Sequence, residues 1–407
     1  MANPASAGMA EPGIVIIGGG LAAAQPAIQL RQLRFHGAIT ILSAAGVAPY
    51  WKPPLSKSIL QGTEPAESAW IRPPEFWARR RIDLRLHAPA ARLNPAAKTI
   101  ITTNGDVLPY SHAVLATGAA NVVPPLPGLN LPGVHGLRSL ADALALRDAA
   151  LPGLRVAVLG GGFIGLEAAS ALTARGATVT VIEREPRLLA RVASPETSAA
   201  VLALHRRHGV TIRLGCAATH AAGTGHVQLV SLEDGQEVPC DLLLVCVGIR
   251  PETRLAEAAG LACQDGILVD PNMRTTDPAI LALGDCARFP SARYGRMLRL
   301  ESIQNAIDGA AAAAATICGQ PAPYDPLPMI SSMQFDHQLD FIGLADSPDA
   351  TRVTTGGPEH IVLHTKSGIL HAAECQNATP ETATAIRRAI AAGEPFSALV
   401  PDAHAQA

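Results

Sequence analysis

The sequence predicts an α/β protein with two Rossmann-like nucleotide-binding domains. Its 407 residues are more than one hydrophobic core usually organises, and they suggest two or three domains. Two predicted strands, the β-branched run 14–17 and residues 155–159, each lead into a glycine-rich turn and then into a helical pattern. A strand, a tight glycine turn and a helix in this order are typical of a parallel sheet that binds a nucleotide.

Composition excludes several classes of protein. The chain is 48% apolar and 16% charged, which is typical of a globular fold, and its net charge of −2 disfavours a nucleic-acid binder. No uninterrupted apolar run is long enough to predict a membrane span, and the first twelve residues lack the basic start of a signal peptide. The seven cysteines include no CxxC pair, so we expect no metal site, no redox dithiol and a reduced, cytoplasmic protein.

The first glycine turn follows the strand 14–17 and has the pattern G-x-G-x-x-A. Gly18 permits the tight turn, Gly20 lets the backbone approach a pyrophosphate, and Ala23 lets the helix pack on the strand. The phosphates are then expected at the helix N-terminus, where free N–H groups and the helix dipole favour negative charge.

The second turn repeats this pattern about 140 residues later. Gly160, Gly162 and Gly165 stand between the strand 155–159 and a helix that begins near residue 166. Two such turns predict two dinucleotides, and the natural pair is a flavin and a nicotinamide nucleotide.

The residues beyond each turn differ. The strand after the second turn ends at Glu183, where an acid accepts hydrogen bonds from a ribose 2′-OH and repels a 2′-phosphate, which favours NADH over NADPH. Arg184 and Arg191 lie nearby and weaken that preference. After the first turn the expected acid is missing from residues 43–46, and Ser43 offers only a weaker contact to the adenosine ribose of FAD.

Residues 50–57, Tyr-Trp-Lys-Pro-Pro-Leu-Ser-Lys, form a stiff segment that ends in Lys57. Its two prolines exclude a helix interior and a central strand. By itself the segment is either a surface connection or a rigid mount for one positive charge.

Together these segments resemble the glutathione-reductase-like flavoproteins, and more narrowly the FAD-dependent NADH:ferredoxin reductases that serve bacterial oxygenases and cytochromes P450. The matching residues are Gly18-x-Gly20, Pro53 to Lys57, Ala116-Thr117-Gly118, Gly160 to Glu167, Glu183, Gly248 to Pro251, Leu283-Gly284-Asp285 and Glu301-Ser302-x-x-Asn305-Ala306.

The resemblance implies roles for these residues. Lys57 is expected near flavin N5, paired with Glu167, and Lys52 and Pro53 are expected against the flavin. The other implied contacts are Thr117, Gly118, Asp285, Asn305 and Ala306 to FAD, and Gly248 and Glu301 beside the nicotinamide.

The resemblance also implies three domains. An FAD domain is expected to comprise residues 1–118 and 248–325, with an NAD domain, 119–247, inserted in it. Residues 326–407 are expected to form an α+β interface domain, which makes a homodimer as compatible with the sequence as a monomer.

The implied reaction is hydride transfer from NADH to FAD, followed by single-electron transfer to a [2Fe–2S] ferredoxin. An acidic ferredoxin requires a basic docking face. The loop 287–300 contains no acid and is either that face or an ordinary solvated loop; its basic residues are Arg288, Arg293, Arg296 and Arg299.

Two departures from the family pattern leave the electron acceptor open. Ser331 and Ile303 stand where family members have tryptophan. Alternative predictions are therefore an NADH oxidase or diaphorase that reduces oxygen or a quinone, or a non-catalytic flavoprotein that senses NADH.

Overall fold

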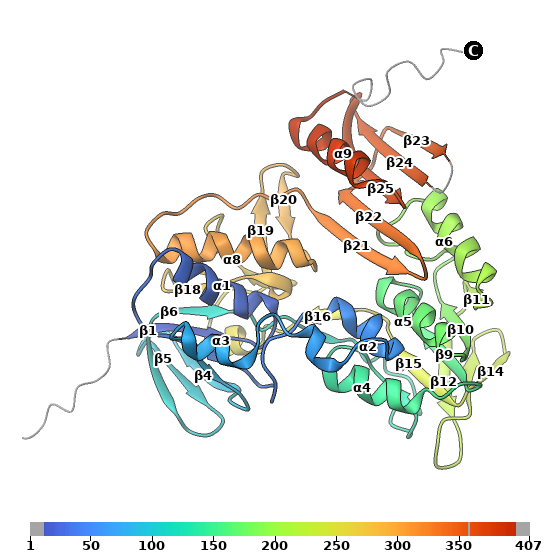
Figure 1. The fold of residues 1–407 in the computed structure, drawn as a ribbon, viewed down its shortest axis with the longest axis horizontal. Coiled ribbons are helices and arrows are strands. Elements are labelled where there is room, and N and C mark those ends of the chain that lie inside the picture. The colour runs from blue at the N-terminus through green and yellow to red at the C-terminus, as the bar shows by residue number, and fades with distance from the viewer. Residues whose placement is uncertain (1–11, 357–358, 396–407) are drawn as a thin grey trace, which may run out of the picture. The chain divides into compact units, whose positions relative to one another are not determined.

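The computed structural model describes residues 12–356 and 359–395. Its chain divides into two compact units (Figure 1). Unit 1 contains the residues up to 51 together with 70–120 and 250–326. Unit 2 contains 52–69, 121–249 and the residues from 327 onward.

Unit 1 is built on a sheet of seven strands whose core is parallel. The strands β3, β2, β1, β6 and β18 lie side by side in that order, and each neighbouring pair is parallel. An antiparallel extension, β5 and β4, continues from the side of β6. The strands are β1 (Gly13–Ile17), β2 (Ile39–Leu42), β3 (Asp83–Arg85), β4 (Ala90–Asn94), β5 (Thr99–Thr102), β6 (Val107–Leu115) and β18 (Ile280–Ala282).

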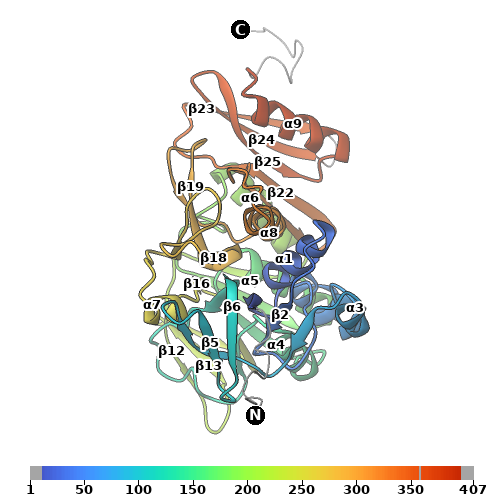
Figure 2. The same ribbon diagram turned by 90° about the vertical axis from the view of Figure 1, so that its left-hand side faces the viewer.

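Two helices of unit 1, α1 (Leu21–Gln32) and α8 (Ile303–Ile317), pack against each other beside this sheet (Figure 2). Their buried positions are mostly alanine, including Ala24 and Ala27 on α1 and Ala310 on α8, so the two backbones approach closely. The remaining elements of unit 1 are α3 (Pro74–Arg79), α7 (Arg254–Ala258), η3 (Gly284–Cys286), β17 (Ile267–Leu268), β19 (Ala287–Ser291) and β20 (Arg296–Leu298).

Unit 2 contains a second parallel sheet, in the order β11, β10, β9, β15 and β8. The central strand β15, Leu242–Val245, is covered on both faces and is apolar throughout. The strands are β8 (Val134–His135), β9 (Arg155–Leu159), β10 (Thr178–Glu183), β11 (Thr211–Leu214) and β15 (Leu242–Val245). Each of the two parallel sheets contains a strand that leads directly into a predicted glycine turn. The predicted α/β class is thereby confirmed.

The helices of this part of unit 2 begin in two different ways. Ser139 caps α4 (Leu140–Ala149) and Ser194 caps α6 (Pro195–Arg207) through their hydroxyls, whereas α5 (Phe163–Ala174) starts at Gly162 with no side-chain cap. The other elements are η1 (Pro53–Ser56), α2 (Ser58–Gln61), η2 (Ala66–Ala69), β12 (Ala218–Ala222), β13 (Leu229–Leu232) and β14 (Glu237–Pro239). Short strands β7 (Ala119–Asn121) and β16 (Ile249–Pro251) pair where the chain passes between the units.

The C-terminal part of unit 2 is an antiparallel sheet with one helix, drawn in orange and red in Figure 1. Its strand order is β21, β22, β25, β24, β23, and the helix α9 packs on β25 and β22. The bounds are β21 (Met329–Gln334), β22 (His337–Gly343), β23 (Ala350–Gly356), β24 (Glu359–Lys366), β25 (Ile369–Gln376) and α9 (Pro380–Ala392). Ile342, Leu363 and Ile386 lie in the core between sheet and helix.

Within the described ranges, no helix is long and apolar enough to cross a membrane. The same residues contain no group of three or more His, Cys, Asp or Glu side chains arranged to hold a metal ion.

Candidate functional site

The first glycine turn is crowded at its start and open at its end. Gly18 has φ of +147°, and a Cβ atom there would lie 2.2 Å from the carbonyl oxygen of Ala116. At Gly20, in contrast, no atom of the described residues other than its own chain neighbours lies within 4 Å of an added Cβ. Gly20 is the N-cap of α1 and offers no side-chain cap, so the first N–H groups of that helix are available to an anion. This arrangement fits the pyrophosphate of a dinucleotide.

The second turn has the same geometry in unit 2. Gly160 has φ of +105°, and a Cβ would lie 2.3 Å from the carbonyl oxygen of Cys246. A Cβ on Gly165 would lie 2.1 Å from the carbonyl oxygen of Gly160, so this helix position needs glycine to pack on the turn. Gly162 is again open to 4 Å and is the uncapped N-cap of α5. Both turns therefore present bare backbone where a dinucleotide phosphate is expected.

The side chain beneath each turn is different. The N–H groups of Gly161 and Glu185 donate to the carboxylate of Glu183, over N···O distances of 2.6 and 2.8 Å. In unit 1 the equivalent place belongs to Ser43, whose Oγ would lie 2.3 Å from a Cβ on Gly19. Ser43 is completely buried, and its hydroxyl accepts the N–H of Ala45. The serine occupies the position of the missing acid and is engaged with its own loop.

His87 lies beside the same segment and was missed by the sequence analysis. Its imidazole packs on Gly46, where a Cβ would lie 2.3 Å from Cε1. The residue is exposed, follows β3 and has φ of +52°. The unusual φ of a single histidine has no signature in the sequence that could have identified it.

Two further predicted segments lie near the first turn. A Cβ on Gly284 would lie 2.7 Å from the Cβ of Ala22, so the short helix η3, which contains Asp285, approaches the first turn of α1. Thr117 donates its hydroxyl to the carbonyl oxygen of Glu252, and the carbonyl oxygen of Gly118 accepts the N–H of the same glutamate. Unit 1 thus brings three of the predicted FAD segments together from distant parts of the chain.

Asn305 is used inside unit 1. Its side-chain amide donates to the carbonyl oxygen of Leu300 over 2.8 Å, and its Oδ1 accepts the Tyr324 hydroxyl over 2.7 Å. Asn305 and the following Ala306 are both buried. The amide therefore fixes the beginning of α8. Because its side chain is engaged in this way, Asn305 would contact a cofactor through its backbone atoms.

Lys57 and Glu167 form an ion pair within unit 2. The lysine Nζ lies 2.7 Å from Glu167 Oε2, with side-chain exposures of 24% and 4%. This is the pairing that the resemblance implies. Lys57 follows the short helix η1, whose N-cap is Lys52 and whose prolines include Pro53. Since an isolated buried carboxylate costs several kcal/mol in lost hydration, Glu167 needs strong partners.

Two serines supply the other partners. Ser56 Oγ donates to Glu167 Oε2, and Ser332 Oγ donates to Oε1 over 2.7 Å. Ser56 belongs to the segment expected from the sequence, whereas Ser332 on β21 was not predicted. Ser332 is next to Ser331, which stands where family members have tryptophan. The hydroxyl of Ser331 donates to Asp340 and not to Glu167.

A chain of polar groups continues from Ser332 into the interior. Gln334 Nε2 donates to Ser332 Oγ, and Gln334 Oε1 lies 2.9 Å from His205 Nε2. Burial lowers the pKa of His205 to about 4, so its ring is neutral near pH 7 and Nε2 carries the proton toward Gln334. These directions leave the Ser332 hydroxyl proton for the carboxylate of Glu167.

The predicted basic loop is a β-hairpin in part, since β19 and β20 pair antiparallel within 287–300. Arg299 is only 13% exposed, and its guanidinium lies 2.5 Å from Glu301 Oε1 and 3.3 Å from Asp265 Oδ1. Arg288 donates to the carbonyl oxygen of Gln264. The segment is therefore partly paired and not only a solvated loop, and alternating apolar positions such as Phe289 and Leu298 are buried.

Several other predicted positions are partly or fully exposed to solvent. Gly248 has φ of +116° with open space around it, and Ile303, the first residue of α8, is 41% exposed. On the loop that follows β10, Arg191 is exposed and Arg184 pairs with Glu185.

Known proteins share both this sequence and this fold. A family model for the pyridine nucleotide-disulphide oxidoreductases matches residues 12–310. The chain is 39% identical to a probable ferredoxin reductase, CtmF, of Castellaniella defragrans, over 91% of each protein. It is 41% identical to a rubredoxin-NAD(+) reductase of Pseudomonas putida, over 77% of this chain and 82% of that protein.

A solved structure agrees with these relatives. The reductase of the covalent putidaredoxin reductase–putidaredoxin complex superposes with a TM-score of 0.91 at 34% identity, over 95% of this chain and 94% of that chain. The expected resemblance and the expected cofactors, FAD and NAD(H), are thereby confirmed. With two open glycine turns and this similarity along most of its length, the chain belongs to the pyridine nucleotide-disulphide oxidoreductase family.

Proposed function

We propose that this protein is an FAD-dependent reductase that takes hydride from NADH and passes electrons singly to a [2Fe–2S] ferredoxin serving an oxygenase or a cytochrome P450. The observation that carries the proposal is the pair of glycine turns, each ending in an uncapped helix whose N-cap glycine faces open space. FAD supplies the chemistry that joins the two halves of the reaction, because a flavin accepts a hydride and releases electrons one at a time.

The residues of unit 1 are assigned to FAD. Gly18, Gly20 and Ala23 hold the pyrophosphate region against the start of α1, and Asp285, with Thr117 and Gly118, contacts the ribityl and pyrophosphate groups. Support comes from the close approach of η3 to α1. The remaining FAD assignments are Ser43, Lys52, Pro53, Asn305 and Ala306.

Lys57 is assigned to stabilise negative charge on the flavin when hydride arrives. A fixed ammonium lowers the energy of the reduced, more anionic ring, and this effect is largest where water is excluded. Glu167, held by Ser56 and Ser332, pairs with the lysine ammonium and fixes its position. Glu167 is therefore the positioning partner of the catalytic lysine.

The nicotinamide nucleotide is assigned to the second glycine turn and the residues that follow it. Gly160, Gly162 and Gly165 hold its pyrophosphate, and Glu183 accepts the adenosine ribose hydroxyls. The other assignments are Arg184 and Arg191 beside that ribose and Gly248 and Glu301 beside the nicotinamide ring.

Substitution of Glu183→Ala should weaken NADH about tenfold and NADPH distinctly less. The carboxylate is lost as a ribose acceptor, and hydrogen bonds to charged groups contribute about 1.5–3 kcal/mol. Its removal also relieves repulsion of a 2′-phosphate. Titration of both nucleotides measures the two dissociation constants, with Glu196→Ala on the exposed start of α6 as the control. Equal losses for the two nucleotides would defeat the assignment of NADH specificity.

The relatives support the choice of partner. One solved neighbour is a complex with putidaredoxin, and one relative is named a ferredoxin reductase. For the docking face we assign Arg288, Arg293, Arg296 and Arg299, with Arg299 contributing least because it is largely buried between two carboxylates. Association should then weaken as salt is raised.

One experiment separates this function from its alternatives. Purified protein should be yellow, should bleach on anaerobic addition of NADH, and should then reduce a [2Fe–2S] ferredoxin much faster than oxygen. Fast reduction of oxygen or a quinone in the absence of a protein electron acceptor would identify an oxidase or diaphorase. Faster reduction of rubredoxin than of ferredoxin would give this protein the acceptor named for its Pseudomonas putida relative. Negligible turnover on every acceptor would indicate an NADH sensor. Oligomeric state and a cytoplasmic location stay predictions.

A further inference from the structure

The segment 184–194, which we call the ribose loop, continues from Glu183 and folds back over the second glycine turn. The N–H of Leu189 donates to the carbonyl oxygen of Gly161 over 3.0 Å. The side chain of Leu188 is buried so close to Gly161 that a Cβ there would lie 2.6 Å from Leu188 Cδ2. The position of this loop therefore affects the surroundings of any nucleotide held by the turn.

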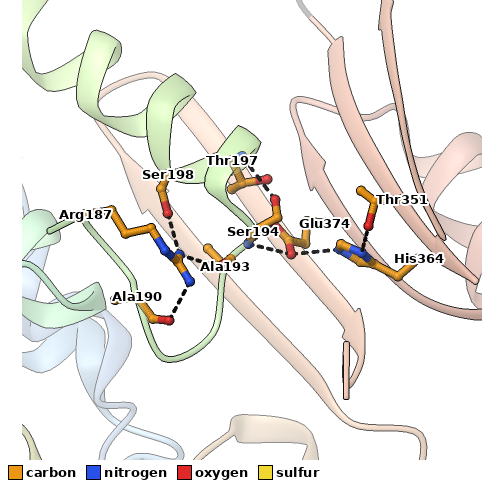
Figure 3. Close-up of polar contacts among 9 residues, drawn as sticks. All are labelled: Arg187, Ala190, Ala193, Ser194, Thr197, Ser198, Thr351, His364 and Glu374. Atoms are coloured by element: carbon orange, nitrogen blue, oxygen red, sulfur yellow. Dashed lines mark hydrogen bonds and ion pairs between the residues drawn. The ribbon is translucent and has the colours of Figure 1, made fainter. Parts of the chain in front are cut away.

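The ribose loop is fastened to itself through Arg187 (Figure 3). The guanidinium donates to the carbonyl oxygens of Ala190, over 2.8 Å, and Ala193, and to Ser198 Oγ over 2.9 Å. Ser198 is already in helix α6, so one side chain joins the middle of the loop to its end and to the helix that follows.

The far end of the loop is held by a carboxylate from another sheet. Glu374 on β25 accepts the N–H of Ser194 over 2.8 Å and the hydroxyl of Ser194 over 2.9 Å, as Figure 3 shows. His364 on β24 contacts the same carboxylate, with Nε2 2.9 Å from Oε1, and its Nδ1 lies 3.1 Å from the Thr351 hydroxyl. Glu374 and His364 are each only 3% exposed at the side chain.

The carboxylate is strongly held in its ionised form. Burial by itself would raise the pKa of Glu374, but donors that include His364 and Ser194 outweigh it, and the pKa lies below its ordinary range. Ser194 is also the N-cap of α6, where negative charge is favoured by the helix dipole. A buried, ionised, fully engaged carboxylate is a rigid anchor.

We propose that Glu374 is a positioning residue for the nicotinamide nucleotide, which it serves by anchoring the ribose loop at Ser194. Glu183 holds the near end of the loop through Gly161 and Glu185, and Glu374 holds the far end. A loop that is ordered before binding does not lose that conformational freedom on binding, and affinity rises accordingly. The inference deepens the proposed function and rests on it.

Glu374→Gln and Ser194→Ala test this role by different routes, one removing the charge and one the hydroxyl. We expect each to weaken ADP-ribose and NAD⁺ about fivefold to tenfold in calorimetric titrations of the FAD-loaded protein. The rate of flavin reduction at saturating NADH should change less than twofold. Ser139→Ala is the matched control, because it removes a helix N-cap of α4 in the same unit with no link to Glu374.

Four results would decide the matter. If Ser194→Ala and Ser139→Ala lower Tm alike but only the former weakens ADP-ribose, the anchor is supported. Unchanged ADP-ribose affinity in both Glu374→Gln and Ser194→Ala would overturn it, as would an equal loss of affinity in Ser139→Ala. Failure of the unaltered protein to bind ADP-ribose or NAD⁺ would instead overturn the proposed function on which the inference rests.

Discussion

Gly162→Ala is expected to yield a folded, yellow protein that NADH barely reduces, and Gly20→Ala a folded protein that retains little FAD. Apart from chain neighbours, no atom in the described part of the chain lies within 4 Å of a Cβ at either position. Neither glycine has a left-handed φ, so the apoprotein can accept the methyl group. Under the proposed assignments the pyrophosphate takes that open space, so the added methyl group should displace it. Overpacking costs about 1–3 kcal/mol, which corresponds to about fivefold to 150-fold in affinity.

The measurement compares binding with folding. Titration of FAD into the Gly20→Ala apoprotein and of NAD⁺ into Gly162→Ala gives the affinities, and thermal unfolding gives Tm. The matched contrast is Gly160→Ala, whose Cβ would meet the carbonyl oxygen of Cys246 at 2.3 Å and should lower Tm directly. Normal NAD⁺ affinity in Gly162→Ala would show that the second turn does not hold the pyrophosphate.

Lys57→Met is expected to slow reduction of the flavin by NADH about a hundredfold to a thousandfold, the range seen when one transition-state charge contact is removed. The substitution also leaves Glu167 buried with two hydroxyls and no cation. Breaking a buried ion pair in this way costs about 3–5 kcal/mol of stability. FAD should remain bound, since the glycine turn of unit 1 is untouched.

Anaerobic stopped-flow absorbance of the flavin gives the rate of reduction. The exposed Lys366→Met should behave as the unaltered protein. Adding Glu167→Gln to Lys57→Met should recover much of the stability but none of the rate, because it removes the unpaired charge without restoring the ammonium. Reduction at the ordinary rate in Lys57→Met would remove the lysine from the proposed mechanism.

The glycine turns could be found from the sequence because their chemistry is local. A turn that needs left-handed φ at Gly18 or Gly160, next to an apolar strand, is written within about six residues. The same holds for Glu183, which stands at a fixed distance from its turn. The lysine segment 53–57 could be assigned only through the resemblance, since its own residues fit a surface connection equally well.

The partners of these residues could not be found in the same way. Ser332 lies 165 residues from Glu167, and Ser194 lies 180 residues from Glu374. No periodicity or motif joins positions so far apart, and serine has too many ordinary uses to be singled out. The hairpin within 287–300 was missed for a related reason, because burial of Phe289 and Leu298 depends on what packs against them.

By itself, the sequence determined the two glycine turns and predicted that bare backbone there holds two dinucleotides, because glycine conformation and helix N-termini are properties of a few consecutive residues. Only the tertiary structure decided which donors hydrogen-bond to the buried carboxylates. Glu167 accepts hydroxyls from two distant segments, and Glu374 accepts donors at the end of the ribose loop. Buried charge is stable only where folding brings donors to it, and those donors are chosen by packing.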